Sequence, residues 1–346
     1  MALLSTIDGL IGKLDEWYFR FRWHRNRQEP LMFHQGWGSE GALDAVHAQW
    51  GSTAPPASIE IGWEQDWVAE QGVWIRRGSF ATPAYAEHLP AESGMAFVHF
   101  VRPTLDETGP VVLLMPTSRE AGVRLRMPAA LALARHGISS LLLESPYMGR
   151  RKSPDQYQGV LSFFSDFLVL CAASIEEGRS LLGWLDRQGF DQLCVAGISQ
   201  GGYLSSVTGL RAPVSTHIVA MLPPHSGVAV LVDGLLGRLC DWERLQQTCS
   251  LDSPVRQQMI ELFAQTSLER LPPPAPHQRL TLVAARQDRY VPSTSYALLE
   301  QHWQQNADVR WLSGGHVSSI VERRHFIDAI VDTLSPALPS PLLTAS

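Results

Sequence analysis

Cysteine is scarce in this sequence, and the four cysteines never form the C-x-x-C spacing typical of zinc and redox sites. A basic excess is also missing, because 28 lysines and arginines stand against 34 aspartates and glutamates. No apolar stretch reaches the length of a membrane-spanning helix. We therefore expect no metal site, no nucleic-acid partner and no membrane span.

We also expect no secretory signal, because Asp8 interrupts the first apolar run and charged residues follow it. We therefore expect a cytoplasmic protein with free thiols. Cys240 and Cys249 would form a small disulfide loop only in an exported protein. Cys171 and Cys194 lie in apolar stretches typical of a helix and a strand, which predicts that both are core residues.

Residues 1–27 have the pattern of an amphipathic helix that is rich in aromatic side chains and arginine. Such a helix either packs on the body of the protein or makes a peripheral membrane contact, and we favour packing. We expect residues 1–70 to be a helical extension on a core domain of residues 71–336. Residues 337–346 are expected to be a frayed tail. The sequence does not indicate an oligomeric state.

Beyond residue 71, short apolar stretches alternate with helical ones. The expected strands are 73–80, 95–101, 111–116, 137–144, 192–197, 217–222, 279–286 and 308–313, and the expected helices are 123–136, 158–188 and 318–335. This alternation predicts an α/β fold with a mostly parallel central sheet and helices on both faces. The alternation lapses over 224–278, which we interpret as a helical insertion after the sixth strand that lies over the mouth of the sheet as a lid.

Two glycine-rich stretches match known motifs, but only one of them has the strand and helix on either side that its motif requires. Residues 36–41, GWGSEG, fit the dinucleotide pattern G-x-G-x-x-G, but no strand precedes them, so we predict a turn and no cofactor. Residues 197–201, GISQG, fit G-x-S-x-G, and here an apolar strand precedes and a helical stretch follows. That context predicts a nucleophile elbow, in which Ser199 stands on a sharp strand-to-helix turn.

A serine hydroxyl becomes a nucleophile only with a base and a carboxylate that orients the base. In chains with this elbow, the acid and the histidine follow the serine in that order. Asp288 comes just after the expected strand 279–286, and His316 lies in a glycine loop after the strand 308–313. Both residues therefore lie at the carboxyl ends of the parallel strands, as Ser199 does. Ser199, Asp288 and His316 are predicted to form a catalytic triad.

Acyl transfer also needs donors for the oxyanion. One predicted donor is the backbone N–H of Gln200, directly after the serine. The other should come from the loop after residues 111–116, at Thr117 or Ser118. Tyr147 follows a strand at the edge where α/β sheets bind ligands, and His225 follows the sixth strand, so both are predicted to contact substrate.

Glu144 is the other carboxylate at a strand end. It precedes Ser199 in the sequence, which is the wrong order for a triad acid. We expect instead a structural ion pair with Arg150 or Arg151.

Four stretches together resemble a known family. They are LLLESPYMGRRK (141–152), GISQGGYLSS (197–206), DRYVP (288–292) and GGHVSS (314–319). Over most of its length the chain resembles the α/β-hydrolase domain-containing protein eighteen family. The resemblance implies an α/β-hydrolase fold and a serine hydrolase with an acyl-ester or lipid-like substrate. One departure is PTSREAG at 116–122, where a glycine-rich oxyanion loop is expected.

The leading hypothesis is therefore a serine esterase or lipase that cleaves a carboxylic ester through an acyl-enzyme, without metal or organic cofactor. An acyltransferase would pass the same acyl group to an alcohol instead of water. A serine peptidase is a further alternative, because GISQGGY resembles the elbow of prolyl-oligopeptidase-type enzymes. A non-catalytic binding protein is the fourth alternative. The aromatic N-terminal segment and the insertion predict a largely apolar pocket that takes medium or long acyl chains.

Overall fold

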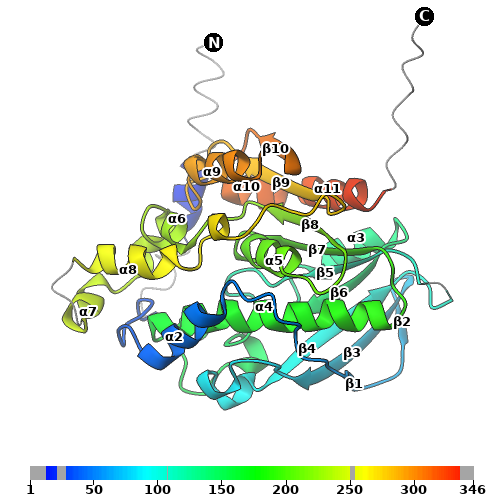
Figure 1. The fold of residues 1–346 in the computed structure, drawn as a ribbon, viewed down its shortest axis with the longest axis horizontal. Coiled ribbons are helices and arrows are strands. Elements are labelled where there is room, and N and C mark those ends of the chain that lie inside the picture. Colours follow the sequence, from blue (N-terminus) through cyan, green and yellow to red (C-terminus); the bar gives the residue numbers. More distant parts are fainter. Residues whose placement is uncertain (1–12, 22–28, 107, 250–253, 336–346) are drawn as a thin grey trace, which may run out of the picture.

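The computed structural model describes residues 13–21, 29–106, 108–249 and 254–335. Within them the chain forms one ten-stranded sheet in the order β1-β3-β4-β6-β5-β7-β8-β9-β10, and β2 also pairs with β3 (Figure 1). The strands are β1 (Gly62–Trp63), β2 (Val68–Glu70), β3 (Val73–Ala81), β4 (Met95–Arg102), β5 (Val111–Leu114), β6 (Ser139–Leu143), β7 (Leu193–Ile198), β8 (Thr216–Met221), β9 (Leu280–Ala285) and β10 (Asp308–Leu312).

The sheet is mixed, with a parallel centre. From β6 through β5, β7, β8 and β9 to β10 every neighbouring pair is parallel, whereas β1, β2, β3 and β4 pair antiparallel at the other edge. The central parallel strands β5 and β7 are apolar along their length, because both of their faces are covered. This arrangement confirms the predicted α/β class with its mostly parallel centre.

Helices cover both faces of the sheet. Alternate residues of β5 show this directly, because Val111 and Leu113 belong to one core cluster and Val112 and Leu114 to the other. The described α-helices are α2 (Glu40–Gln49), α3 (Met127–Ala134), α4 (Phe164–Arg187), α5 (Gln200–Leu210), α6 (Gly227–Leu231), α7 (Trp242–Gln247), α8 (Val255–Ala264), α9 (Ser293–Trp303), α10 (His316–Val321) and α11 (Arg324–Leu334). Helices α2, α4 and α5 lie on one face, and α3 and α11 lie on the other (Figure 1).

Two parts of the chain differ from their sequence-based prediction. Strands β1 and β2 fall within residues 1–70, which were expected to be helical or irregular; at two and three residues they are too short to show a period-two pattern. Residues 318–335 were predicted as one helix, but Glu322 leaves helical geometry and separates α10 from α11. The apolar spacing continues across this break and hides it in the sequence.

Within the insertion predicted at 224–278, the structure describes residues 224–249 and 254–278. They contain α6, α7 and α8 with the 3-10 turns Leu235–Leu239 and Leu268–Arg270. The GWGSEG stretch forms a turn in which Gly36 pairs with Phe163, and Ser39 caps α2.

All four cysteines are free thiols, and Cys171 and Cys194 are buried. The predicted frayed tail lies outside the described residues.

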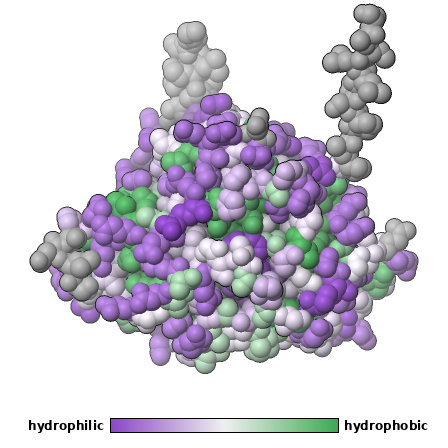
Figure 2. Space-filling model, viewed as in Figure 1, coloured by the Kyte–Doolittle hydropathy of each residue, from purple (hydrophilic) through white to green (hydrophobic). Residues whose placement is uncertain are grey.

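Residues 13–21 are helical, and much of the aromatic surface of this helix is exposed. Trp17 is 61 % exposed and Phe21 46 %. On the face seen in Figure 2, by contrast, hydrophobic residues are scattered among polar ones, which is normal for a protein surface. A peripheral membrane contact stays a prediction. None of the described helices is long and apolar enough to cross a membrane.

Candidate active site

The turn between β7 and α5 holds Ser199 in a strained conformation, with φ 58° and ψ −120°. The flanking glycines permit this turn because their neighbours come too close for a side chain. A Cβ on Gly197 would lie 2.2 Å from the Gly201 carbonyl oxygen, and one on Gly201 would lie 2.9 Å from the Met115 carbonyl oxygen. The turn is therefore the sharp strand-to-helix crossing that the sequence predicted at this position.

Ser199, His316 and Asp288 form a continuous hydrogen-bonded line. The Ser199 Oγ lies 3.0 Å from His316 Nε2, and His316 Nδ1 lies 2.6 Å from Asp288 Oδ2. These residues follow the carboxyl ends of β7, β9 and β10, which belong to the same run of parallel strands, with β8 between β7 and β9. The line allows a proton to pass from the hydroxyl to an imidazole that a carboxylate holds in place.

Asp288 is held by three groups besides the imidazole. Its Oδ1 accepts the backbone N–H groups of Tyr290 and Val291, each at 2.8 Å, and its Oδ2 accepts the Tyr296 hydroxyl at 2.6 Å. The Asp288 side chain is fully buried. These bonds fix the carboxylate so that its Oδ2 accepts a hydrogen bond from Nδ1 of His316.

His316 is also buried, and the ring of Tyr290 stacks on its imidazole with centroids 5.1 Å apart. Burial is the largest single influence on the pKa of His316 and lowers it, because a buried imidazolium loses its hydration. Asp288 and Asp15 together outweigh burial and raise the pKa above its ordinary value of 6.5. The site therefore favours a positive charge on His316, as it must when a proton arrives from serine.

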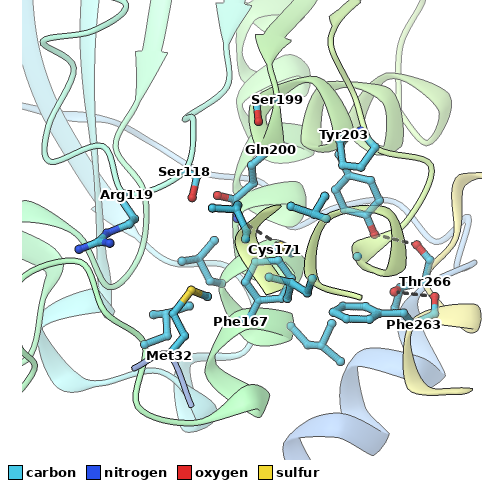
Figure 3. A pocket seen from close by; sticks show the side chains of 18 of the residues that line it. Met32, Ser118, Arg119, Phe167, Cys171, Ser199, Gln200, Tyr203, Phe263 and Thr266 are labelled. Carbon is cyan, nitrogen blue, oxygen red and sulfur yellow. Dashed lines mark hydrogen bonds between the residues drawn. The ribbon is translucent and has the colours of Figure 1, made fainter. Parts of the chain in front are cut away.

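Two cavities meet at Ser199. The smaller, of about 80 Å³, is lined mainly by apolar side chains, and Figure 3 shows Ser118 and Gln200 at its Ser199 end. Its walls come from the N-terminal region, from α4 and from the insertion: Met32, Val46, Trp50, Phe167, Leu168, Val230, Leu231 and Phe263. The larger, of about 420 Å³, is also lined by His316, Thr117, Tyr18 and Val321. Sequence reasoning predicted an apolar pocket but named none of the eight wall residues given above for the smaller cavity.

The predicted oxyanion residues lie beside Ser199. Gln200 begins α5, so its backbone N–H has no acceptor within the helix. Thr117 lines the larger cavity, and Ser118 lines both. The Gln200 side chain turns away and donates to the Cys171 Sγ at 3.5 Å (Figure 3).

The structure does not bring Tyr147 and His225 to the two cavities. Tyr147 has φ 61°, and its hydroxyl donates to the carbonyl oxygen of His88 at 3.2 Å. The ring of His225 lies 2.9 Å from the Ser295 hydroxyl. Strand-end position predicted where their backbone lies, but local turns direct both side chains elsewhere.

Three further observations concern charged and metal-binding side chains. Glu144 pairs with Arg150 at 2.9 Å and also with His99 at 3.0 Å, which confirms the predicted ion pair. No group of three or more His, Cys, Asp or Glu side chains in the described part of the chain could hold a metal ion. A residue that sequence reasoning missed is Asp15, whose carboxylate hydrogen-bonds the backbone of His316.

A mixed sheet with a parallel centre, helices on both faces and an elbow after β7 defines the α/β-hydrolase fold. Within that fold class, the chain belongs to the family described as "Alpha/beta hydrolase domain containing 18", whose model matches residues 31–260 and 249–335.

Solved structures of similar fold include two acetyl xylan esterases. The enzyme from Paenibacillus sp. R4 is 14 % identical with a TM-score of 0.55, and the match covers 86 % of this chain and 97 % of that one. Acetyl xylan esterase 1 from Thermoanaerobacterium sp. JW/SL YS485 is 13 % identical with a TM-score of 0.54, covering 90 % and 98 %. At this identity the likeness concerns the fold.

Proposed function

We propose that this protein is a serine hydrolase that cleaves a carboxylic ester through an acyl-enzyme on Ser199. The observation that carries the proposal is the hydrogen-bonded line from Ser199 through His316 to Asp288. A strained elbow, a buried carboxylate and two cavities lined by the serine support it, because an ester must present both an acyl and an alcohol part.

In the first half-reaction, His316 Nε2 accepts the Ser199 proton while Oγ attacks the ester carbonyl carbon. Asp288 stabilises the imidazolium that forms. The backbone N–H of Gln200, with a donor at Thr117 or Ser118, stabilises the oxyanion. The C–O bond to the alcohol then breaks, and the alkoxide takes the proton from His316. In the second half-reaction water replaces the alcohol and the steps run in reverse, which releases the acid and restores Ser199.

The smaller cavity is the proposed acyl site and the larger one the site of the leaving alcohol. The wall of the smaller cavity is mostly apolar, which suits a hydrocarbon chain and disfavours a charged or sugar-like acyl group. The preferred substrate is therefore an ester with an apolar acyl chain, as in lipid-like esters. None of these steps requires a metal or an organic cofactor.

Labelling with a fluorophosphonate probe tests the nucleophile. Native protein should be labelled, and Ser199→Ala should not, because the probe forms a bond only with an activated serine oxygen. Ser205→Ala is the matched control, since that buried serine on α5 donates to the Gly202 carbonyl oxygen at 2.9 Å and lies away from both cavities. Equal labelling of native protein and Ser199→Ala would overturn the proposal.

A series of nitrophenyl esters tests the acyl site. Val230→Phe should shift the preference of the enzyme to shorter acyl chains, because Val230 lines the smaller cavity. Val232→Phe, two residues further in the insertion and outside both cavities, should leave the preference unchanged. Repeating the assay with added alcohols separates hydrolysis from acyl transfer, and short peptide anilides test peptidase activity.

A further inference from the structure

A buried carboxylate that sequence reasoning did not assign to the site touches both of its loops. Asp15 belongs to the helical residues 13–21, and its side chain is completely buried. Phe19, one turn further along, is buried on the same face and packs against Leu235 and Leu239. The helix thus presents an acidic and an aromatic side chain to the interior.

The Asp15 carboxylate accepts three backbone hydrogen bonds. Its Oδ2 accepts the N–H of Arg289 at 3.0 Å and that of His316 at 2.9 Å, and its Oδ1 accepts the N–H of Val317 at 2.9 Å. Arg289 directly follows Asp288, and His316 begins α10. A single side chain therefore fastens the loop of the proposed acid to the loop of the proposed base.

The start of α10 depends on a distant acceptor such as this one. The first N–H groups of a helix have no partner within it, and a nearby negative charge stabilises them. Gly315, which precedes α10, has no side chain that could accept these bonds. A Cβ at Gly315 would lie 2.8 Å from Asp15 Oδ2, so the glycine also leaves room for the carboxylate.

Asp15 also acts on the charge of His316. Within the described residues, the ring is bordered by the Asp288 carboxylate, the Ser199 hydroxyl and the ring of Tyr290. Burial lowers the pKa of His316, whereas Asp288 and, through space, Asp15 raise it. Removal of the Asp15 charge should therefore lower this pKa.

We propose that Asp15 is a positioning residue. It holds the loop after β9 and the start of α10 at the distance that lets His316 contact both Asp288 and Ser199. The proposal rests on the proposed function of those three residues. It assigns to the N-terminal helix, 301 positions before His316 in the sequence, a part in the geometry of the site.

Asp15→Asn is the decisive variant. It keeps the size of the side chain but replaces one acceptor oxygen by an NH₂ group, which faces a backbone N–H and cannot accept. We expect the rate of fluorophosphonate labelling and kcat on a nitrophenyl ester to fall about 10- to 100-fold, because small errors in the placement of reacting groups have effects of this size. KM should change much less, since Asp15 lines neither cavity.

The pH profile provides a readout that a merely structural role would not move. The acid limb of the labelling rate should shift to lower pH in Asp15→Asn, because the pKa of His316 falls. Glu16→Gln is the matched control, because the Glu16 carboxylate is partly exposed and lies 3.9 Å from Arg20. This variant should change neither the labelling rate nor the acid limb of its pH profile.

Two further variants keep the test informative if Asp15→Asn folds poorly. Gly315→Ala retains Asp15 but pushes a Cβ against its carboxylate, so we expect a smaller loss of rate. Phe19→Ala removes the apolar anchor of the helix and leaves the hydrogen bonds, so it should affect stability more than rate per folded molecule.

The outcomes separate the two proposals. If native protein is labelled at Ser199 but Asp15→Asn, measured per folded molecule, has the native rate and acid limb, the positioning role is wrong. The positioning role is also wrong if Phe19→Ala and Asp15→Asn reduce the labelling rate equally and neither variant shifts the acid limb of its pH profile. If native protein is not labelled at Ser199, the proposed function has failed instead.

Discussion

Two buried pairs of a basic and an acidic side chain, Arg151–Glu177 and His316–Asp288, differ in the groups that their polar atoms contact. Arg151 and Glu177 are both fully buried and joined by two hydrogen bonds, at 2.5 and 2.9 Å. The same guanidinium also donates to the backbone carbonyl oxygens of Glu144 and Ser93. These bonds connect the end of β6, helix α4 and the loop before β4.

The pair of His316 and Asp288 has the same burial but a different partner set. Asp288 is satisfied by backbone N–H groups and the Tyr296 hydroxyl, and its histidine keeps Nε2 for Ser199 at the junction of two cavities. The Arg151–Glu177 pair has only structural partners, whereas a histidine with one nitrogen directed at a serine hydroxyl can move a proton. The comparison predicts that disruption of the first pair affects stability and that of the second affects rate.

The largest effect that would sharpen this contrast is expected from Asp288→Asn. An amide in place of the carboxylate favours the wrong tautomer of His316 and removes the charge that stabilises imidazolium, so kcat should fall by about 10⁴-fold. Thermal unfolding should change little by comparison, because the amide oxygen can still accept some of the same bonds. Ester turnover and calorimetry on the same preparation check both parts, and a near-native kcat would refute the assigned role.

Arg151→Met should have a smaller effect, and it should lower stability rather than rate. Removal of one partner leaves the Glu177 carboxylate buried without a counter-charge, which costs about 3–5 kcal/mol in the free energy of unfolding. Turnover per folded molecule should stay native. The double variant Arg151→Met with Glu177→Leu should recover much of the stability, since two apolar residues can replace a buried ion pair. Urea titration measures this, and a stable single variant would contradict the contrast.

Sequence reasoning reached the local signals of this site but not its long-range contacts. The elbow at Ser199, the acid loop at Asp288 and the glycine loop at His316 each follow a recognisable strand, so their convergence could be predicted from chain order and sheet geometry. The structure brings these three side chains together. Helices and strands with long apolar patterns were predictable for the same reason.

The missed features depend on contacts between segments far apart in the chain. Asp15 looked like one charge in an amphipathic helix, because nothing in its neighbours indicates that three backbone N–H groups will surround it. Trp50 carries no signal that it lines a cavity beside Ser199. The orientation of Tyr147 depends on a single positive φ angle, which its sequence context did not indicate.

The smallest predicted effect concerns pH and again distinguishes the two pairs. Because the pKa of His316 is raised above 6.5, its neutral form, which accepts the serine proton, is lost at a higher pH than for an ordinary histidine. The acid limb of kcat/KM should therefore lie above 6.5. A limb at or below that value in the native protein would contradict the electrostatic account of the site.

Stability should respond in the opposite direction over the same range. A histidine with a raised pKa in the folded state contributes stability that is fully present below the pKa of the unfolded chain and is lost as pH rises through the folded value. Folded protein should thus gain activity and lose some stability as His316 gives up its proton. His316→Gln should remove that part of the pH dependence of the unfolding temperature, whereas Arg151→Met should retain it.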